Sequence, residues 1–300
     1  MKNNDLLKEF DKFLNGKEIT TDEEFDKAFN EFIISKGLMS PEDNEEPDEE
    51  DVYYYLDLAQ SATSKKNALK YAKKALELEP DNLDAEAMVA ECSATSFEAL
   101  IEKYEALLEK EKNKLTKQGY FKADSIGDFW LIFETRPYMR LYDSYVHLLI
   151  DCGKMKTAVK HCVEMLRLCE NDNLGIRHSL MNLYAYLEDD ESAIELFKKY
   201  ENEYSAMFLL PLSILYYKLV DLKKSAKYLK KLKNTNEDTL EFFKGINKGQ
   251  MDFLENESPY GYRPFTIEEL MLEFAENPFL FVTTKTYFEW AYKKLKNMKS

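Results

Sequence analysis

Apolar residues recur every three or four positions along most of this chain, which is the spacing of an amphipathic helix. The pattern is clearest at Phe97, Ile101, Tyr104 and Leu108, which predict one long helix over 94–117. Glycine and proline, the residues that most often end regular elements, occur only 9 and 8 times in 300 residues. A sheet-rich fold would need more turns than this composition supplies. The pattern therefore predicts an all-α protein.

Two helices are predicted at the start of the chain. An apolar stripe over 6–14 indicates the first, and a capping box formed by Thr21 and Glu24 opens the second. Residues 1–40 are therefore predicted to form an N-terminal helical hairpin. The next segment, 41–51, contains eight acidic residues, no basic residue and two prolines, so it is predicted to be a solvated acidic linker. An acidic interaction tail is the alternative for this segment.

Small residues at regular spacing predict repeated helical hairpins in the rest of the chain. Ala68 and Ala75 precede Pro80 in the arrangement of a tetratricopeptide second helix, where two helices cross so closely that only small side chains fit. The small residue returns at three further places: Ala158, Ala193 and Ala226. Their separations of 35 and 33 residues are close to the roughly 34 residues of that repeat. Residues 52–300 are therefore predicted to form an α-α superhelix, a tetratricopeptide-like (TPR-like) solenoid of antiparallel hairpins, with an insertion at 119–127 and a divergent C-terminal cap.

Two tracts of the chain are more specific than a plain repeat requires. Residues 127–140 read G-D-F-W-L-I-F-E-T-R-P-Y-M-R, and residues 166–177 read L-R-L-C-E-N-D-N-L-G-I-R. They resemble the tracts G-x-F-W-x-x-x-E-T-R-P-Y-M-R and L-R-L-N-P-N-D-N-Q-G-V-R of a bacterial family of tetratricopeptide proteins, related to the suppressor of tumorigenicity seven family. Glu170 and Leu174 depart from the proline and the glutamine of that family. The resemblance covers 52–295 and implies a repeat fold and a binding role, without a reaction.

The first tract contains a predicted junction between the insertion and the next helix. Thr135 is expected to N-cap that helix, with Pro137 in its first turn, where a missing N–H costs nothing. The whole predicted junction consists of Glu134, Thr135, Arg136 and Pro137. One interpretation is that Arg136 braces the insertion against the next repeat. The alternative is that Arg136, Arg140 and Arg177 present guanidinium groups to a carboxylate or phosphate of a partner.

The first helix of each hairpin is expected to line the concave face of such a solenoid. Counted from the alanine spacing, the predicted partner-binding groove contains Arg140, Asp143, His147, Arg177, His178 and Asn182. We expect a non-enzymatic scaffold that binds a peptide or protein segment in this groove. The alternative is a metal- or small-ligand-binding enzyme or sensor that uses His147 and His178. A clamp for a terminal carboxylate fits poorly, because Asp143 and Gly175 stand where such a clamp needs other residues.

Motif and charge patterns narrow the function further. Phosphate loops, dinucleotide fingerprints, nucleophile elbows and zinc-protease motifs are absent from the sequence, so we predict no catalytic residue, no metal ligand and no cofactor. The net charge of −15, about half of it in 41–51, disfavours nucleic acid as a partner, because phosphate needs a basic surface. The lysine run over 223–233 is predicted to be a solvated outer face. Alternatively, it attracts the acidic linker of another copy, and the protein self-associates.

Compartment signals point to a cytoplasmic protein. The N-terminal residues are too charged for a signal peptide, and the longest uncharged apolar stretch, 206–217, is too short to span a bilayer. The four cysteines form no CxxC pair and lie among apolar residues, as free thiols do: Cys92, Cys152, Cys162 and Cys169. A soluble protein with no membrane partner is therefore predicted.

Overall fold

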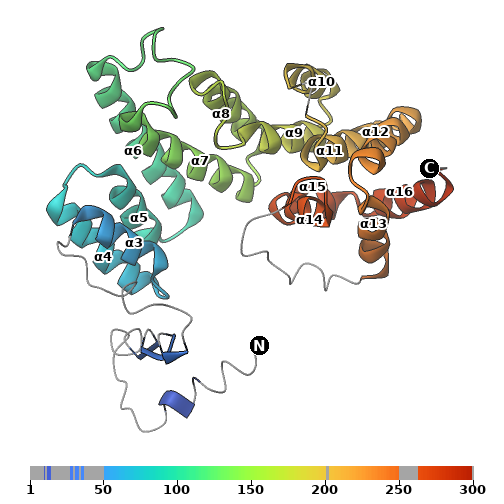
Figure 1. Ribbon diagram of the computed structural model, residues 1–300. Coiled ribbons are helices and arrows are strands. Elements are labelled where there is room, and N and C mark those ends of the chain that lie inside the picture. The colour runs from blue at the N-terminus through green and yellow to red at the C-terminus, as the bar shows by residue number, and fades with distance from the viewer. Residues whose placement is uncertain are drawn as a thin grey trace.

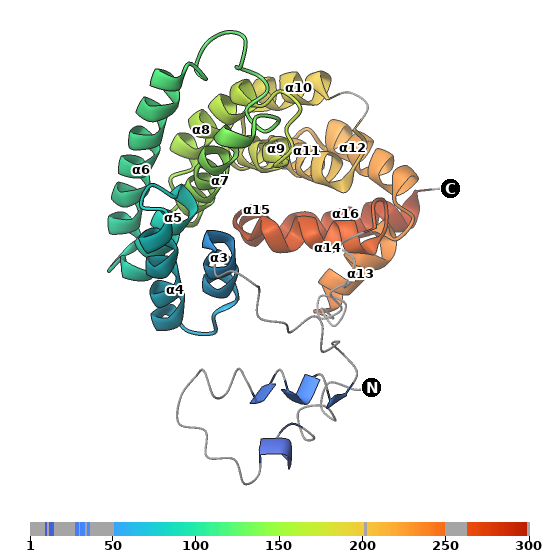
Figure 2. The same cartoon turned by 60° about the vertical axis from the view of Figure 1, so that its left-hand side comes forward.

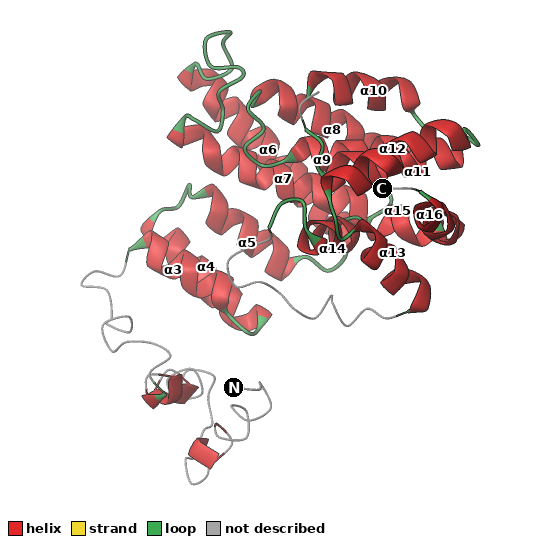
Figure 3. Cartoon of the chain, turned by 45° about the vertical axis from the view of Figure 1, so that its right-hand side comes forward, coloured by secondary structure: helices red, strands yellow, loops and turns green. Residues whose placement is uncertain are grey.

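The computed structural model describes residues 51–200, 203–249 and 263–298, together with isolated residues between 10 and 36. Over these residues the chain is helical, with no strand and only two isolated bridges (Figure 3). The predicted all-α superhelix is therefore confirmed (Figure 1). The α-helices are α3 (Val52–Ser61), α4 (Lys65–Leu78), α5 (Leu83–Ser93), α6 (Phe97–Gln118), α7 (Arg136–Asp151), α8 (Met155–Leu168), α9 (Ile176–Leu187), α10 (Asp190–Lys199), α11 (Ala206–Lys218), α12 (Leu222–Thr235), α13 (Thr239–Lys248), α14 (Ile267–Glu276), α15 (Pro278–Thr283) and α16 (Lys285–Asn297).

Helices that follow one another pack side by side as hairpins. The pairs are α3 with α4, α5 with α6, α7 with α8, α9 with α10 and α11 with α12. First helices also contact one another, α3 with α5, α5 with α7, and α9 with α11, and this stacks the hairpins into a curved array (Figure 2). The first helices lie on the inner side of the curve and the second helices on its outer side. Because each hairpin touches mainly its neighbours, the array has one long inner surface.

The same turn joins the two helices in three of the hairpins. One turn residue has a positive φ of 62° to 70°, in the left-handed region: Gly153, Glu188 and Val220. The next residue is the N-cap of the second helix: Lys154, Asp189 and Asp221. Four residues after each N-cap lies a fully buried small side chain: Ala158, Ala193 and Ser225. The turn therefore sets which residue of the second helix faces the first.

The position predicted at Ala226 was wrong by one residue. Ser225 is fully buried, whereas Ala226 is partly exposed. The Ser225 hydroxyl donates a hydrogen bond of 2.7 Å to the carbonyl of Ser213 on α11, where α11 and α12 cross. The crossing needs a small residue rather than an apolar one, so a serine with a local hydrogen-bond partner meets the same requirement.

The segment between α6 and α7 folds onto the loop that follows α8. Gly119 ends α6 in the left-handed region, with a φ of 93°. The amides of Gly127 and Phe129 donate to the carbonyl of Leu168, at 3.1 and 3.0 Å. Irregular structure begins where the insertion was predicted to begin, and it continues beyond residue 127 to the 3-10 turn η2 (Phe133–Thr135). These contacts position the start of α7.

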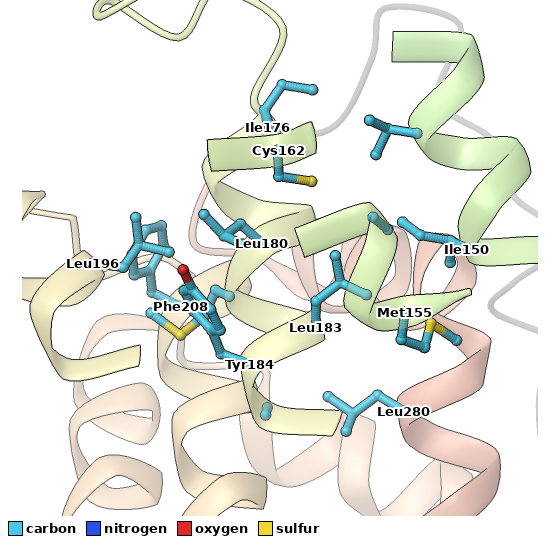
Figure 4. Close-up of a cluster of buried hydrophobic side chains, with 14 of the residues drawn as sticks. Ile150, Met155, Cys162, Ile176, Leu180, Leu183, Tyr184, Leu196, Phe208 and Leu280 are labelled. Carbon is cyan, nitrogen blue, oxygen red and sulfur yellow. The ribbon is translucent and has the colours of Figure 1, made fainter. Parts of the chain in front are cut away.

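The last helices lie across the inner side of the array instead of extending it (Figure 2). α14 packs against α11, α15 against α9, and α16 against α12 and α13. Leu280 of α15 is fully buried and belongs to the same core cluster as Leu183 of α9 (Figure 4). A divergent cap was predicted for this region, but its position was not. The C-terminal half of the inner surface is therefore covered by the chain itself.

The predicted N-terminal hairpin and acidic linker lie largely outside the described residues. Within the hairpin, the ring of Phe10 lies 5.2 Å from that of Phe29 and 5.1 Å from that of Phe32. The two predicted apolar stripes therefore face each other where they are described. None of the described helices is both long enough and apolar enough to cross a bilayer.

Candidate functional site

The inner surface of the array is divided into two parts, which we call the open half and the covered half. The open half is the inner face of α3, α5 and α7. The covered half is the inner face of α9 and α11, which lies beneath α14 and α15 (Figure 2). Three predicted groove residues are on α7: Arg140, Asp143 and His147. The other three are on α9: Arg177, His178 and Asn182.

A pocket of about 800 Å³ lies in the open half, lined by α3, the start of α4, α5 and α7. Four alanines line it: Ala59, Ala62, Ala68 and Ala87. Polar side chains lie among them: Asp57, Gln60, Lys65, Glu91 and Ser144. Small side chains allow the backbone of a bound segment to come close, and the polar groups can satisfy its N–H and C=O groups. The pocket is therefore suited to a peptide segment.

Arg140 lies at the wall of this pocket and is already paired. Its Nε donates to Asp84 Oδ1 on α5 at 2.9 Å, and its Nη2 donates to the other oxygen of the same carboxylate. This two-point contact joins α7 to α5. The Arg140 side chain remains 45% exposed, so it still contacts the pocket. A ligand carboxylate would have to share this guanidinium with Asp84.

Asp143 and His147 lie one turn apart on α7, near the boundary of the two halves. Asp143 Oδ1 is 3.5 Å from His147 Nε2, and it is buried without a hydrogen bond. Burial raises the pKa of the Asp143 carboxyl, and His147 opposes this shift. His147 is 56% exposed and lines a second pocket of about 240 Å³ together with Glu276 and Phe279. Of the predicted groove histidines, His147 is the accessible one.

Arg177 and His178 lie at the start of α9, and both contact Glu203, which lies between α10 and α11. Arg177 Nε and His178 Nε2 lie 2.7 Å from the two oxygens of Glu203. Arg177 Nη1 also donates to Asp172 Oδ2 at 2.8 Å. Burial alone would oppose ionisation of Glu203, but the hydrogen bonds from His178 and Arg177 lower its pKa to about 2. Both side chains therefore have partners inside the fold.

Asn182 lies inside the fold, beneath α14. It is fully buried, and its Nδ2 donates to Glu273 Oε1 at 2.8 Å and to the carbonyl of His178 at 3.1 Å. Glu273 is also buried, and Asn277 Nδ2 donates to its second oxygen at 3.2 Å. Burial raises the pKa of Glu273 well above its usual range. Asn182 thus binds a carboxyl group, but that group belongs to the same chain.

The predicted junction residues have separate roles. Thr135 occupies the N-cap position of α7 but does not cap it; its hydroxyl donates to the carbonyl of Phe129, because that buried carbonyl needs a donor. Pro137 lies in the first turn of α7, as predicted. Arg136 Nε donates to the carbonyl of Trp130 at 2.8 Å, and Glu134 is exposed. Arg136 thus joins the start of α7 to the segment just before it through a carbonyl, and Trp130 lies outside the predicted insertion.

Several residues of the inner surface were missed from sequence. Asp84 and Glu203, which pair with predicted arginines, lie in segments with no distinguishing motif. Glu269, Glu273 and Glu276 recur at helical spacing on α14, and such a stripe normally indicates a solvated face. Glu269 and Glu273 are instead 1% exposed, against α9 and α11. The spacing of these glutamates indicated that they share one face of the helix. It could not show whether that face points to water or to the interior.

Within the described ranges, no group of three or more His, Cys, Asp or Glu side chains is arranged to hold a metal ion. No protein-family model matches the chain, and no curated protein matches it with significant similarity. The resemblance to the bacterial tetratricopeptide family therefore stays a prediction, and any function has to be argued from the two halves of the inner surface.

Proposed function

We propose that this chain is a non-enzymatic scaffold that binds a peptide or protein segment in the open half of its inner surface. The observation that carries the proposal is that the covered half already holds a segment of this kind. Helix α14 lies in it, and two of its carboxyl groups accept hydrogen bonds: Glu273 from the Asn182 side chain of α9, and Glu269 from the Ala206 amide of α11. The open half continues the same surface and contains a pocket without such an occupant among the described residues.

The shape and chemistry of the pocket support a peptide as the occupant. The lining comes from three successive first helices, so a bound segment can contact all three. Met88 and Leu141 add apolar surface to the alanines, and Arg140 and Lys65 provide cations. An apolar surface with polar groups among it can hold the side chains of an extended segment and satisfy its backbone N–H and C=O groups. A cytoplasmic location, in which the thiols stay free, is part of the same proposal; all four cysteines are free.

Blocking the pocket tests the proposal. A displayed library of random peptides would be selected on the immobilised full chain, and an enriched peptide would be synthesised with a fluorescent label. Ser144→Tyr places a ring in the pocket from an exposed position on α7. We expect it to raise the Kd of the peptide by about tenfold or more, as steric blocking of a central contact does.

The matched control is Thr157→Tyr, which adds the same ring at an exposed position on α8, on the outer side of the array. It should leave the Kd unchanged. Equal binding by the wild-type chain and Ser144→Tyr would place the peptide elsewhere and refute the proposal.

A further inference from the structure

One arginine of this chain differs from the other four. Each of the others forms an ion pair with a carboxylate: Arg140 with Asp84, Arg167 with Glu164, Arg177 with Asp172 and Glu203, and Arg263 with Glu268. Arg136 forms no ion pair with any residue that the structure describes, although the chain contains 56 acidic residues. Its neighbour Glu134 is exposed and not paired with it. Arg136 is therefore a cation available to an external anion.

Two aromatic rings hold this guanidinium in place. The Arg136 Cζ lies 5.9 Å from the ring centroid of Trp130 and 5.8 Å from that of Phe133. Its Nε is used by the carbonyl of Trp130 at 2.8 Å. Neither terminal nitrogen, Nη1 nor Nη2, has a hydrogen-bond partner among the described residues. A guanidinium fixed in this way loses little conformational freedom when it binds a carboxylate.

The segment 129–135, just before α7, exposes large apolar side chains beside the Arg136 guanidinium. Phe133 is 66% exposed and Leu131 is 56% exposed. The segment is nevertheless anchored, because Phe129 and Thr135 at its two ends are fully buried. A single exposed apolar residue needs no explanation. Two of them beside an unpaired arginine that lies against two aromatic rings match the composition of protein interfaces, which are enriched in aromatic residues and Arg.

We propose that Trp130, Leu131, Phe133 and Arg136, which we call the rim, bind a carboxylate flanked by an apolar side chain on the partner segment. This inference rests on the proposed function and extends it. Arg136 and Arg140 are one turn apart and so lie on the same face of α7, and Arg140 lines the pocket. A segment in the open half can therefore continue along α7 to the rim. Arg140 shares its charge with Asp84, so the partner's carboxylate binds at Arg136.

The test uses peptides enriched on the wild-type chain and the intrinsic fluorescence of the rim. The chain has two tryptophans, so Trp290→Phe leaves Trp130 as the only tryptophan, and excitation at the red edge of its absorption avoids the tyrosines. Each peptide is compared in four forms: with its acidic residue, with that residue replaced by the neutral amide, with phosphoserine in its place, and with the C-terminus amidated. These forms separate a side-chain carboxylate, a terminal carboxylate and a phosphate.

In this background, Arg136→Gln keeps an N–H donor for the carbonyl of Trp130 but removes the charge. We expect it to raise the Kd of the acidic peptide by about tenfold, as loss of a two-point carboxylate contact does. The Kd of the amide form should stay unchanged. Phe133→Ser should weaken both forms, because it removes apolar contact. Arg167→Gln, at a paired arginine on the outer helix α8, is the matched control and should have no effect.

The outcomes separate the two proposals. If Ser144→Tyr abolishes binding and Arg136→Gln does not, the open half binds the segment and the rim inference fails. If Arg136→Gln acts and Ser144→Tyr does not, the rim binds the peptide and the groove proposal fails. Equal affinity for the acidic and amide forms, or a preference for phosphoserine, overturns the assignment of a carboxylate. A library that yields no wild-type binder contradicts both.

Discussion

At the residue scale, Glu203 shows how this chain uses charge inside the fold. Arg177 and His178 approach its two oxygens, both at 2.7 Å, and its side chain is only 22% exposed. Burial opposes its ionisation, but the hydrogen bonds from His178 and Arg177 outweigh this effect and lower the pKa of Glu203 to about 2. A carboxyl whose folded pKa is lowered stabilises the fold above its unfolded pKa. That contribution is lost as the pH falls from about 4.5 to about 2.

We predict that Glu203→Gln lowers the free energy of unfolding by about 2 kcal/mol at neutral pH, less than the cost of breaking a fully buried pair. The difference in unfolding free energy between the variant and wild type should shrink as the pH falls from the unfolded-state pKa of Glu203, about 4.5, to its folded-state pKa, about 2. Urea unfolding at a series of pH values measures it. Glu164→Gln breaks the partly exposed pair with Arg167 and should cost no more than about 0.5 kcal/mol. A cost at Glu203 that is equal at all pH values would contradict this account.

At the scale of elements, the hairpin turn decides which small residue faces the partner helix. The left-handed residue and the N-cap that follows it place Ser225, rather than Ala226, at the crossing of α11 and α12. Ser213 and Ser225 are fully buried there and hydrogen-bonded to each other. A larger side chain at this crossing would force the helices apart.

We predict that Ser225→Leu destabilises the protein by about 3 kcal/mol or more, through overpacking and the loss of hydrogen bonds. Ala226→Leu, one position on, should change stability by no more than about 0.5 kcal/mol, because its site is partly exposed. Thermal unfolding of the two variants distinguishes them. Equal effects, or a larger effect at Ala226, would restore the register predicted from sequence.

At the scale of the whole molecule, buried carboxyl groups lie where helix α14 packs against the inner surface of the array. Burial raises the pKa of three carboxyl groups on α14, those of Glu269, Glu273 and Glu276, and of Asp143 on α7. His147 and His178 oppose the shift at Glu276, and Asn182 and Asn277 oppose it at Glu273. The folded chain therefore binds more protons here than the unfolded chain does. This contribution to stability is complete below the ordinary carboxyl pKa and is lost as the pH rises.

Glu273→Gln tests this linkage, because an amide is a neutral substitute of the same shape. We expect the variant to be more stable than wild type by about 2 kcal/mol at mildly alkaline pH. The two chains should converge as the pH falls to about 4, where Glu273 is protonated in both states. Melting temperatures across this range measure the difference. Glu289→Gln, at an exposed site on α16, is the control, and a Glu273→Gln variant less stable at high pH would refute the linkage.

Contacts between residues close together in the sequence were predicted, and contacts between distant residues were not. The long helix α6 and the buried alanines Ala158 and Ala193 were predicted correctly, because each reports a contact within one helix or one hairpin. Phe97, predicted at the start of the apolar stripe of α6, is exposed, and the buried stripe begins at Ile101. Arg136 was predicted to be part of a junction. Whether its terminal nitrogens have a partner depends on which acidic residues the fold brings near it. No local pattern contains that information.

The sequence by itself determined the helices, their hairpins and the curved array, since helical periodicity and close crossings are set by residues near one another in the chain. Only the tertiary structure decided which part of the inner surface is open. Asn182 and Glu273, 91 residues apart, meet in the covered half, and no periodicity predicts a pair so distant. A helix with a carboxylate stripe can face water or line an interior. The choice depends on whether the opposing surface supplies donors to those carboxylates, and here α9 and α11 supply them.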